Sequence, residues 1–207
     1  MRNAIVINLD RCTGCDACIA ACKHEHGVDL GVYWNRVIPM GPYGTYPDIQ
    51  MYWLPTMCQQ CVGAPCIEVC PTGASQRDEA TGAVFIDEAS CIGCQNCIGA
   101  CPYGARTFLE DKGIVQKCNL CVDRLHNDEL PACVHNCNTG ARIYGDLDDP
   151  ESDASKALAA AGDNVHRLPD PQGVEPSTAY ILSPSICEWH DIDEERIYDV
   201  RGHTPSF

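Results

Sequence analysis

Four cysteines in the run CIGCQNCIGACPYGA, residues 91–105, follow the spacing C-x2-C-x2-C-x3-C, and this pattern determines most of the fold prediction. The same spacing occurs at residues 12–22, and two looser groups of four lie at residues 58–70 and 118–137. The four groups are Cys12, Cys15, Cys18 and Cys22; Cys58, Cys61, Cys66 and Cys70; Cys91, Cys94, Cys97 and Cys101; and Cys118, Cys121, Cys133 and Cys137. Of the 17 cysteines in the 207-residue chain, Cys187 alone stands outside these groups. Such regular spacing indicates an internal repeat.

The repeat extends beyond the cysteines. A shift of 79 positions, from residue 12 to residue 91, also lays Ile7 on Ile86 and Gly14 on Gly93. A second signature, Cys-x-x-Gly-Ala, begins at the last cysteine of three groups, at residues 70–74, 101–105 and 137–141. Each unit predicts a short strand, a cysteine loop, one helical turn carrying C-x3-C, and a glycine turn into another strand. Four such half-units predict an α+β fold made of two pseudo-symmetric modules.

The spacing of the cysteines indicates iron–sulfur clusters. Two-residue spacers turn three thiolates toward one cluster, and the cysteine one helical turn further on faces a second cluster, as in bacterial two-cluster ferredoxins. Structural zinc sites take cysteines in pairs, which suits the fourth group but not the first or third. Disulfides would strain bridge geometry at this spacing and need an oxidising compartment. Since every group keeps four cysteines, we expect four cubane 4Fe–4S clusters.

The pairing of the groups sets the domain organisation. Only residues 71–90 separate the second and third groups, which suggests one bacterial-ferredoxin-like module with the first and fourth groups closing around it. Spacing alone leaves the other pairing open, first with second and third with fourth. The predicted parts are an outer module (residues 1–22 and 102–145), a β-rich insertion (residues 23–57), an inner module (residues 58–101) and a C-terminal arm with a helix and strands that contacts a partner (residues 146–207).

Composition excludes several classes of protein. The net charge is −15, from 14 Lys and Arg against 29 Asp and Glu, which disfavours a nucleic-acid partner. No apolar run reaches the roughly 18 residues of a bilayer span, so no direct membrane span is expected. The N-terminus lacks the pattern of a secretory signal. No nucleophile triad, phosphate-binding glycine loop or carboxylate pair is present, so the chain is expected to conduct electrons and to have no catalytic residue of its own.

Two cations flank the fourth cysteine group. Lys117 precedes it and Arg124 follows its first half, and a positive charge there would raise the potential of a nearby cluster. A solvated surface charge is the alternative interpretation for both. Cys187 has no cysteine companions and is expected to be a free structural thiol.

Several longer runs resemble a known family. The run QKCNLCVDRL at residues 116–125, PACV at 131–134, CTGC at 12–15 and CPTGA at 70–74 are similar to the iron–sulfur (beta) subunits of DMSO-reductase-type molybdopterin oxidoreductases. The resemblance covers nearly the whole chain. It implies a non-catalytic subunit that transfers electrons between a large catalytic subunit and a quinone-reactive membrane anchor subunit or a soluble redox partner. The molybdenum or tungsten bis-pterin would lie in the catalytic subunit alone. Members often travel with a signal-bearing catalytic subunit, so the resemblance allows a cytoplasmic or an extracytoplasmic location.

The resemblance also implies a ligand set for each cluster. These sets are Cys12, Cys15, Cys18 and Cys137 for cluster 1; Cys58, Cys61, Cys66 and Cys101 for cluster 2; Cys91, Cys94, Cys97 and Cys70 for cluster 3; and Cys118, Cys121, Cys133 and Cys22 for cluster 4. One departure is Asn138, which stands where the family usually has a proline after the final cysteine. Its additional backbone N–H near sulfur predicts a raised potential for that cluster.

Two other functions compete with this interpretation. A stand-alone polyferredoxin, which diffuses between partners, needs little beyond its cluster loops, so the β-rich insertion and the C-terminal arm argue against it. The beta subunit of a related aromatic dehydroxylase or transhydroxylase would show the same cysteine pattern. Only the substrate pocket of the partner subunit separates that function from the first.

Overall fold

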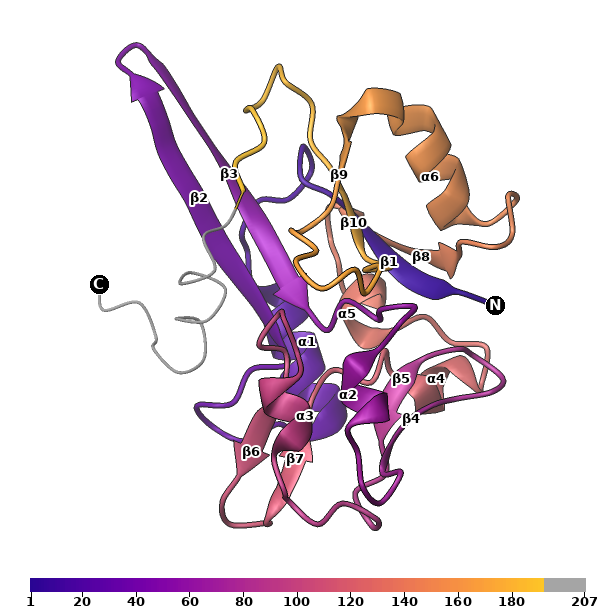
Figure 1. The fold of residues 1–207 in the computed structure, drawn as a ribbon. Helices are drawn as coiled ribbons and strands as arrows, with labels where there is room; N and C mark the ends of the chain where they lie inside the picture. Colours follow the sequence, from indigo (N-terminus) through magenta and orange to yellow (C-terminus); the bar gives the residue numbers. More distant parts are fainter. Residues whose placement is uncertain (192–207) are drawn as a thin grey trace.

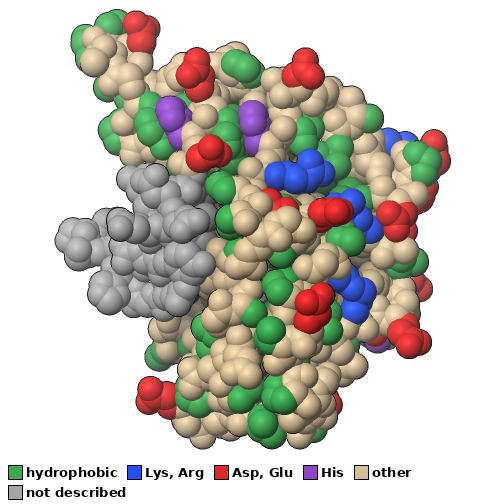
Figure 2. Space-filling view, in the orientation of Figure 1, with side chains coloured by type: hydrophobic (Ala, Val, Ile, Leu, Met, Phe, Trp, Pro, Cys, Tyr) green, Lys and Arg blue, Asp and Glu red, His purple; other side chains and the backbone are tan. Residues whose placement is uncertain are grey.

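The computed structural model describes residues 1–191. Figure 1 shows three parts: a small sheet with one covering helix, a long hairpin that projects from the body, and a region of short helices and two-stranded ribbons. This mixture of helix and strand agrees with the predicted α+β class. Among the described residues, no helix combines the length and apolar character that crossing a bilayer requires. Acidic side chains are spread over the face seen in Figure 2.

The sheet joins the two ends of the described chain. Its strands are β1 (Asn3–Asn8), β8 (Arg142–Asp146), β9 (Val165–His166) and β10 (Ala179–Ile181), in the order β8-β1-β10-β9. Strand β1 is antiparallel to β8 and parallel to β10. Because β1 lies inside the sheet and both its faces are covered, its sequence NAIVIN is apolar on both sides.

Helix α6 (Asp153–Ala161) covers one face of this sheet. The Ser152 hydroxyl caps it by accepting a hydrogen bond from the Ser155 N–H, and the helix stops at Gly162, where the 3-10 turn η1 (Gly162–Asn164) begins. Its Ala154 packs against Val6 and Ile181. The residues predicted as a C-terminal arm are therefore built into the sheet as far as β10, and residues 192–207 of that arm lie outside the described part.

The β-rich insertion is a hairpin. Strands β2 (Asn35–Thr45) and β3 (Asp48–Met57) pair antiparallel, with a register shift between Met40 and Tyr43. At the base, Met57 of β3 is buried against the sheet, whereas Tyr46 at the tip is 88% exposed. Figure 1 shows the hairpin rising away from the remainder of the chain.

The cysteine regions consist of short elements. They are α1 (Ala17–His26), α2 (Pro65–Glu68), β4 (Ser75–Arg77), β5 (Val84–Ile86), α3 (Asn96–Gly99), β6 (Thr107–Leu109), β7 (Ile114–Gln116), α4 (Val122–Leu125) and α5 (Ala132–His135). Strands β4 and β5 form one ribbon, and β6 and β7 form another. Although cysteine spacing assigned β6 and β7 to the outer module, Phe108 and Val115 pack with Cys66 and Cys97 of the inner module.

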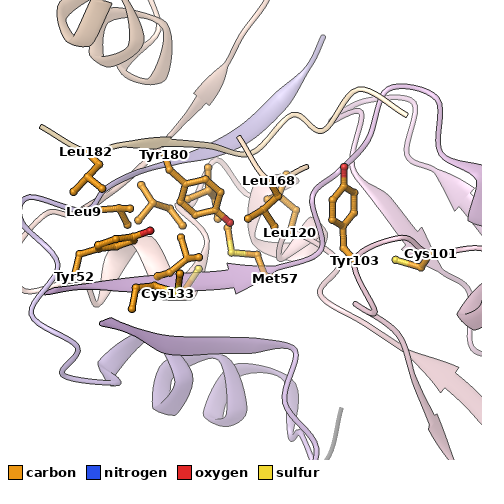
Figure 3. Close-up of a cluster of buried hydrophobic side chains, with 14 of the residues drawn as sticks. Leu9, Tyr52, Met57, Cys101, Tyr103, Leu120, Cys133, Leu168, Tyr180 and Leu182 are labelled. Atoms are coloured by element: carbon orange, nitrogen blue, oxygen red, sulfur yellow. The ribbon is translucent and has the colours of Figure 1, made fainter. Parts of the chain in front are cut away.

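The main core connects the sheet, the base of the hairpin and the cysteine loops. Figure 3 shows Leu9, Tyr52, Met57, Leu120, Cys133, Leu168, Tyr180 and Leu182 gathered in it, with Tyr103 and Cys101 at one end. The Tyr180 ring is fully buried. Because Cys101 and Cys133 belong to this core, apolar packing fixes the position of two of the predicted cluster ligands.

Candidate metal centres

Each cysteine group ends in a helix that begins one residue before its third cysteine. Helices α1, α2, α3 and α5 start at Ala17, Pro65, Asn96 and Ala132, and their third cysteines follow directly as Cys18, Cys66, Cys97 and Cys133. The fourth cysteine comes four residues later in every group. One helical turn therefore separates the third and fourth cysteines, as the C-x3-C spacing predicts.

The loops of the first and third groups share the same unusual backbone. Gly14 and Asp16 have φ of +66° and +58°, and Gly93 and Gln95 have φ of +67° and +63°. An added Cβ at Gly14 would lie 2.3 Å from the Trp53 ring, and one at Gly93 would lie 2.2 Å from the Gly113 carbonyl oxygen. Both glycines are required by the positive φ and by this close approach.

Four cavities lie among the cysteine loops, and four cysteines line each of them. Cavity 1 is lined by Cys12, Cys15, Cys18 and Cys137; cavity 2 by Cys58, Cys61, Cys66 and Cys101; cavity 3 by Cys91, Cys94, Cys97 and Cys70; and cavity 4 by Cys118, Cys121, Cys133 and Cys22. In each cavity, three cysteines come from one group and one from another.

The cavities join the first group with the fourth and the second with the third. The sets of four that line them coincide with the ligand sets that the family resemblance implies. None of the four cavities combines cysteines of the first and second groups. Four soft thiol donors around one cavity form the donor set of a 4Fe–4S cluster, so the residues present fit that cofactor.

Burial raises the pKa of half of these sixteen thiols, so these eight resist ionisation in the absence of a metal. Burial raises the pKa of Cys22 to about 12 and that of Cys121 to about 11, and it raises the pKa of Cys118 well above the usual range. Metal coordination removes the thiol proton even from such sites. Iron binding at the deepest cysteines is therefore expected to release protons.

Two cysteines, Cys70 and Cys137, have a lowered pKa because hydrogen-bond donors surround their sulfurs. Burial opposes ionisation at Cys70, but hydrogen bonds to its sulfur outweigh burial and leave its pKa below the usual value. The Ser75 N–H donates to Cys70 Sγ over 3.3 Å. The pKa of Cys137 is lowered in the same way, chiefly by the Arg142 N–H and the Thr139 hydroxyl. Backbone N–H groups directed at sulfur are one of the means by which proteins tune iron–sulfur sites.

The other predicted site residues lie in three different settings. Buried Lys117 donates through Nζ to the carbonyl oxygens of Val84 and Cys118, the latter over 2.8 Å, and lines cavity 2. Arg124 forms ion pairs with Glu25 over 3.0 Å and with Glu129 over 3.1 Å, and it lines none of the four cavities.

Asn138, the third predicted site residue outside the cysteines, lies at cavity 1. Its Oδ1 accepts a hydrogen bond from Cys15 Sγ at 3.7 Å. Cys187 is buried in the main core and lines none of the four cavities.

Sequence reasoning missed two arginines beside the cysteines. Arg106 lines cavities 2 and 3, and Arg142 lines cavities 1 and 4. His26 Nε2 lies 3.1 Å from Cys121 Sγ. A signal for the arginines was present, because each follows a Cys-x-x-Gly-Ala signature directly.

Comparison with known proteins agrees with this geometry. Residues 49–147 match the model of a 4Fe-4S dicluster domain, and residues 5–25 match that of a 4Fe-4S binding domain. A Halobacterium salinarum chain, named as an iron-sulfur subunit of dimethyl sulfoxide reductase, is 41% identical over 86% of this chain and 78% of the relative. A sulfite dehydrogenase subunit of Allochromatium vinosum is 36% identical, over 86% and 82%. The arsenate respiratory reductase iron-sulfur subunit of a Shewanella species is 32% identical, over 88% and 97%.

These matches cover most of both chains, and they confirm the family predicted from the cysteine runs. The relatives are named as subunits of reductases and dehydrogenases. Ferredoxin-type 4Fe–4S domains are present at both the N-terminus and the centre of this chain. The chain belongs to the iron–sulfur (beta) electron-transfer subunits of DMSO-reductase-type molybdopterin oxidoreductases, and is itself non-catalytic.

Proposed function

We propose that this chain holds four 4Fe–4S clusters and conducts electrons along them between a molybdenum or tungsten bis-pterin catalytic subunit and a second redox partner. The observation that carries the proposal is the set of four cavities, each lined by four cysteines. The proposed ligands of clusters 1 to 4 are the cysteines of cavities 1 to 4. Bound clusters would supply one-electron redox centres. The first and fourth cysteine groups then form the outer module, and the second and third form the inner one.

The contacts between cavities support a linear order of 3, 2, 4 and 1. Arg106 lines both cavities 3 and 2, and Arg142 lines both cavities 4 and 1. Between these pairs, Lys117 lines cavity 2 and is followed directly by Cys118 of cavity 4. Each cavity thus shares a wall, or a pair of adjacent residues, with the next.

Exposure of the cysteines supports entry and exit at the two ends of this order. Among the sixteen grouped cysteines, Cys94 of cavity 3 and Cys15 of cavity 1 are exposed. In cavities 2 and 4, every cysteine is buried or half-buried. An electron-transfer partner must approach a cluster closely, so we assign the catalytic subunit and the second partner to opposite ends. The second partner is a quinone-reactive membrane subunit or a soluble redox protein.

The polar residues near the cavities then take defined roles. Asn138 has a backbone N–H where the family's proline has none, so we propose that it raises the potential of cluster 1, and Asn138→Pro should lower that potential in a redox titration. Lys117 contributes its positive charge to cluster 2. Arg124, with two carboxylate partners, has the smallest effect of the three on any cluster.

Iron content and cluster-specific spectra test the four-cluster assignment. Anaerobically purified protein should hold about sixteen irons per chain, four for each of four clusters. Cys70→Ser and Cys94→Ser should perturb the same electron paramagnetic resonance (EPR) signal, whereas Cys22→Ser and Cys18→Ser should perturb two different ones. Cys187→Ser is the matched control and should keep all the iron. The assignment fails if the protein holds far fewer irons, or if Cys70→Ser alters a signal that Cys94→Ser leaves intact.

A further inference from the structure

Two arginines occupy the same position in the sequence repeat. Arg106 follows CPYGA at residues 101–105, and Arg142 follows CNTGA at residues 137–141, so each lies five residues after the last cysteine of its group. The second group has Ser75 at that position, after CPTGA. Each pair of cysteine groups therefore has one arginine. Both side chains are buried, with exposed fractions of 3% for Arg106 and 4% for Arg142.

Arg142 lies between the third cysteines of the first and fourth groups. It opens strand β8 and lines both cavity 1 and cavity 4. Its Nη1 is 3.5 Å from Cys133 Sγ, and its Nη2 donates to Asn35 Oδ1 over 2.7 Å. Burial would lower the pKa of Arg142, but Cys133 and Cys18 outweigh burial and raise it. The guanidinium thus faces one cysteine of each cavity.

Arg106 repeats this arrangement between the second and third groups. It lines cavities 2 and 3, and its Nη2 donates to Ser75 Oγ over 2.8 Å. Burial would lower the pKa of Arg106, but Cys66 and Cys97, the third cysteines of their groups, help to raise it. Its Nε and Nη1 atoms are buried without a hydrogen-bond partner among the described residues. These two N–H-bearing atoms remain available to groups inside the cavities.

Within the described part of the chain, neither arginine has a carboxylate partner. Among residues 1–191, the ion pairs of the structure include neither Arg106 nor Arg142. Burying an unpaired guanidinium is unfavourable, and a nearby anion offsets that cost. A 4Fe–4S site with a 2+ core and four thiolates carries 2 − 4 = −2. Two such anions, one on each side, would supply the missing counter-charge.

We propose that Arg106 and Arg142 have equivalent roles. Each buried cation lies between the two clusters of its module and raises the reduction potential of both clusters. The proposal rests on the four-cluster function above. A cation beside a cluster favours its reduced form, because reduction by one electron takes the site from −2 to −3. The electron comes from the adjacent cluster or from the redox partner, and the guanidinium keeps its proton.

Redox titration followed by EPR tests the proposal. Arg106→Met should lower the midpoint potentials of clusters 2 and 3 and leave those of clusters 1 and 4 in place. Arg142→Met should lower the midpoint potentials of clusters 1 and 4 and leave those of clusters 2 and 3 in place. The expected change is about tenfold in each one-electron equilibrium constant, which corresponds to about 59 mV. Arg106→Lys and Arg142→Lys keep the charge and should restore most of the potential. Lys156→Met, which removes a positive charge from the exposed face of α6, should shift none of the four.

The outcomes separate this proposal from the proposed function. Wild-type protein with far fewer than about sixteen irons contradicts the four-cluster function itself. Fully loaded arginine variants with unchanged potentials, or with equal shifts at all four clusters, overturn the arginine proposal alone. If a Met variant does not stay loaded, the proposal requires loss of the two flanking clusters only, about eight irons, with rescue by Lys. Loss from all four clusters, or failure of the Lys rescue, counts against it.

Discussion

The proposed inner and outer modules each combine two groups of four cysteines, but in different scaffolds. Around the inner cysteines, the strands are three residues long and pair only as two separate ribbons. The strands beside the outer cysteines, β1 and β8, lie in the four-stranded sheet that α6 covers. An isolated two-stranded ribbon is marginally stable in water. One ligand pattern can therefore depend on its metal for folding in one place and on an apolar core in another.

The inner module also has the smaller apolar core. The inner core consists of Ala64, Cys66, Val84, Cys97 and Val115, so two of its five buried members are proposed ligands. The outer cysteines adjoin the main core, which includes Ile5, Ile7 and Tyr180 and, from the inner module, Cys101. The hairpin also supports the outer module, because Asn35 of β2 and Met57 of β3 both contact Arg142. Within residues 1–191, Arg106 donates to Ser75, a residue of its own module.

Removal of iron should produce the largest difference between the modules. Under anaerobic chelation, we expect amides of β4–β7 to lose nearly all hydrogen-exchange protection, because metal binding and folding are coupled where the core is small. Amides of β1, β8 and β10 should keep a substantial part of theirs. Hydrogen exchange measured by mass spectrometry checks this by segment. Equal loss in both regions would show that the sheet depends on iron as much as the ribbons do.

Truncating a core side chain should mainly lower the free energy of unfolding in the outer module and mainly speed iron loss in the inner module. Ile7→Ala removes a fully buried side chain from the main core and should lower the free energy of unfolding by about 3 kcal/mol. Val115→Ala removes less volume from the inner core and should mainly speed the loss of iron from clusters 2 and 3. Urea unfolding and chelator-induced bleaching measure the two effects. If Val115→Ala shifts the urea midpoint as far as Ile7→Ala does, the inner module unfolds together with the main core and is not a separate region of low stability.

Local pattern was sufficient for the cysteine loops, because their geometry is short-range. The C-x3-C spacing predicted one helical turn, and α2, α3 and α5 are each four residues long. Helix α1 continues to His26 because no glycine or proline interrupts it before Gly27, whose φ is +56°. The sets of cysteines that share a cavity needed the family resemblance, since spacing alone allowed two pairings.

The sequence pattern could not predict contacts between residues far apart in the chain. The parallel pairing of β10 with β1 joins residues far apart in the sequence, and periodicity contains no information on it. Lys117 adjoins the fourth group in sequence, but its long side chain turns to the Val84 carbonyl and the wall of cavity 2. Arg106 and Arg142 could be found only by aligning the Gly-Ala signatures with one another. Adjacency in sequence does not fix the direction of a long side chain.

The equivalent loop glycines offer a third test. Ala at either position would adopt an unfavourable positive φ, which costs about 1–2 kcal/mol. At Gly14 the added Cβ would meet the Trp53 side chain, whereas at Gly93 it would meet the backbone of Gly113. Trp53→Ala should therefore relieve part of the damage of Gly14→Ala in a double-mutant cycle. Phe108→Ala, the matched control, should relieve much less of the damage of Gly93→Ala, because the backbone contact persists. Equal coupling in the two cycles would contradict this difference.

The smallest expected effect concerns a contact between the modules. Asp78, in the β4–β5 turn, accepts hydrogen bonds from the Thr81 N–H over 2.7 Å and the Thr81 hydroxyl over 2.6 Å, and its carboxylate lies 3.1 Å from His126 Nε2. Burial tends to raise the pKa of Asp78, but Thr81 and His126 outweigh burial and hold it below the usual value. His126 follows α4, so this contact joins the weak inner ribbon to the outer module.

A lowered pKa in the folded state means that the ionised carboxylate stabilises the fold. That contribution is present above the unfolded-state pKa of about 3.9 and is lost as the pH falls through the lower folded-state value. Asp78→Asn should therefore reduce the free energy of unfolding by about 1 kcal/mol at pH 7. The gap between the variant and the wild type should narrow below about pH 4. Urea unfolding of both proteins across this range gives the gap directly, and acid loss of iron affects both alike. A gap that stays constant with pH would mean that the Asp78 charge contributes nothing and that the inner ribbon is held to the outer module by other contacts.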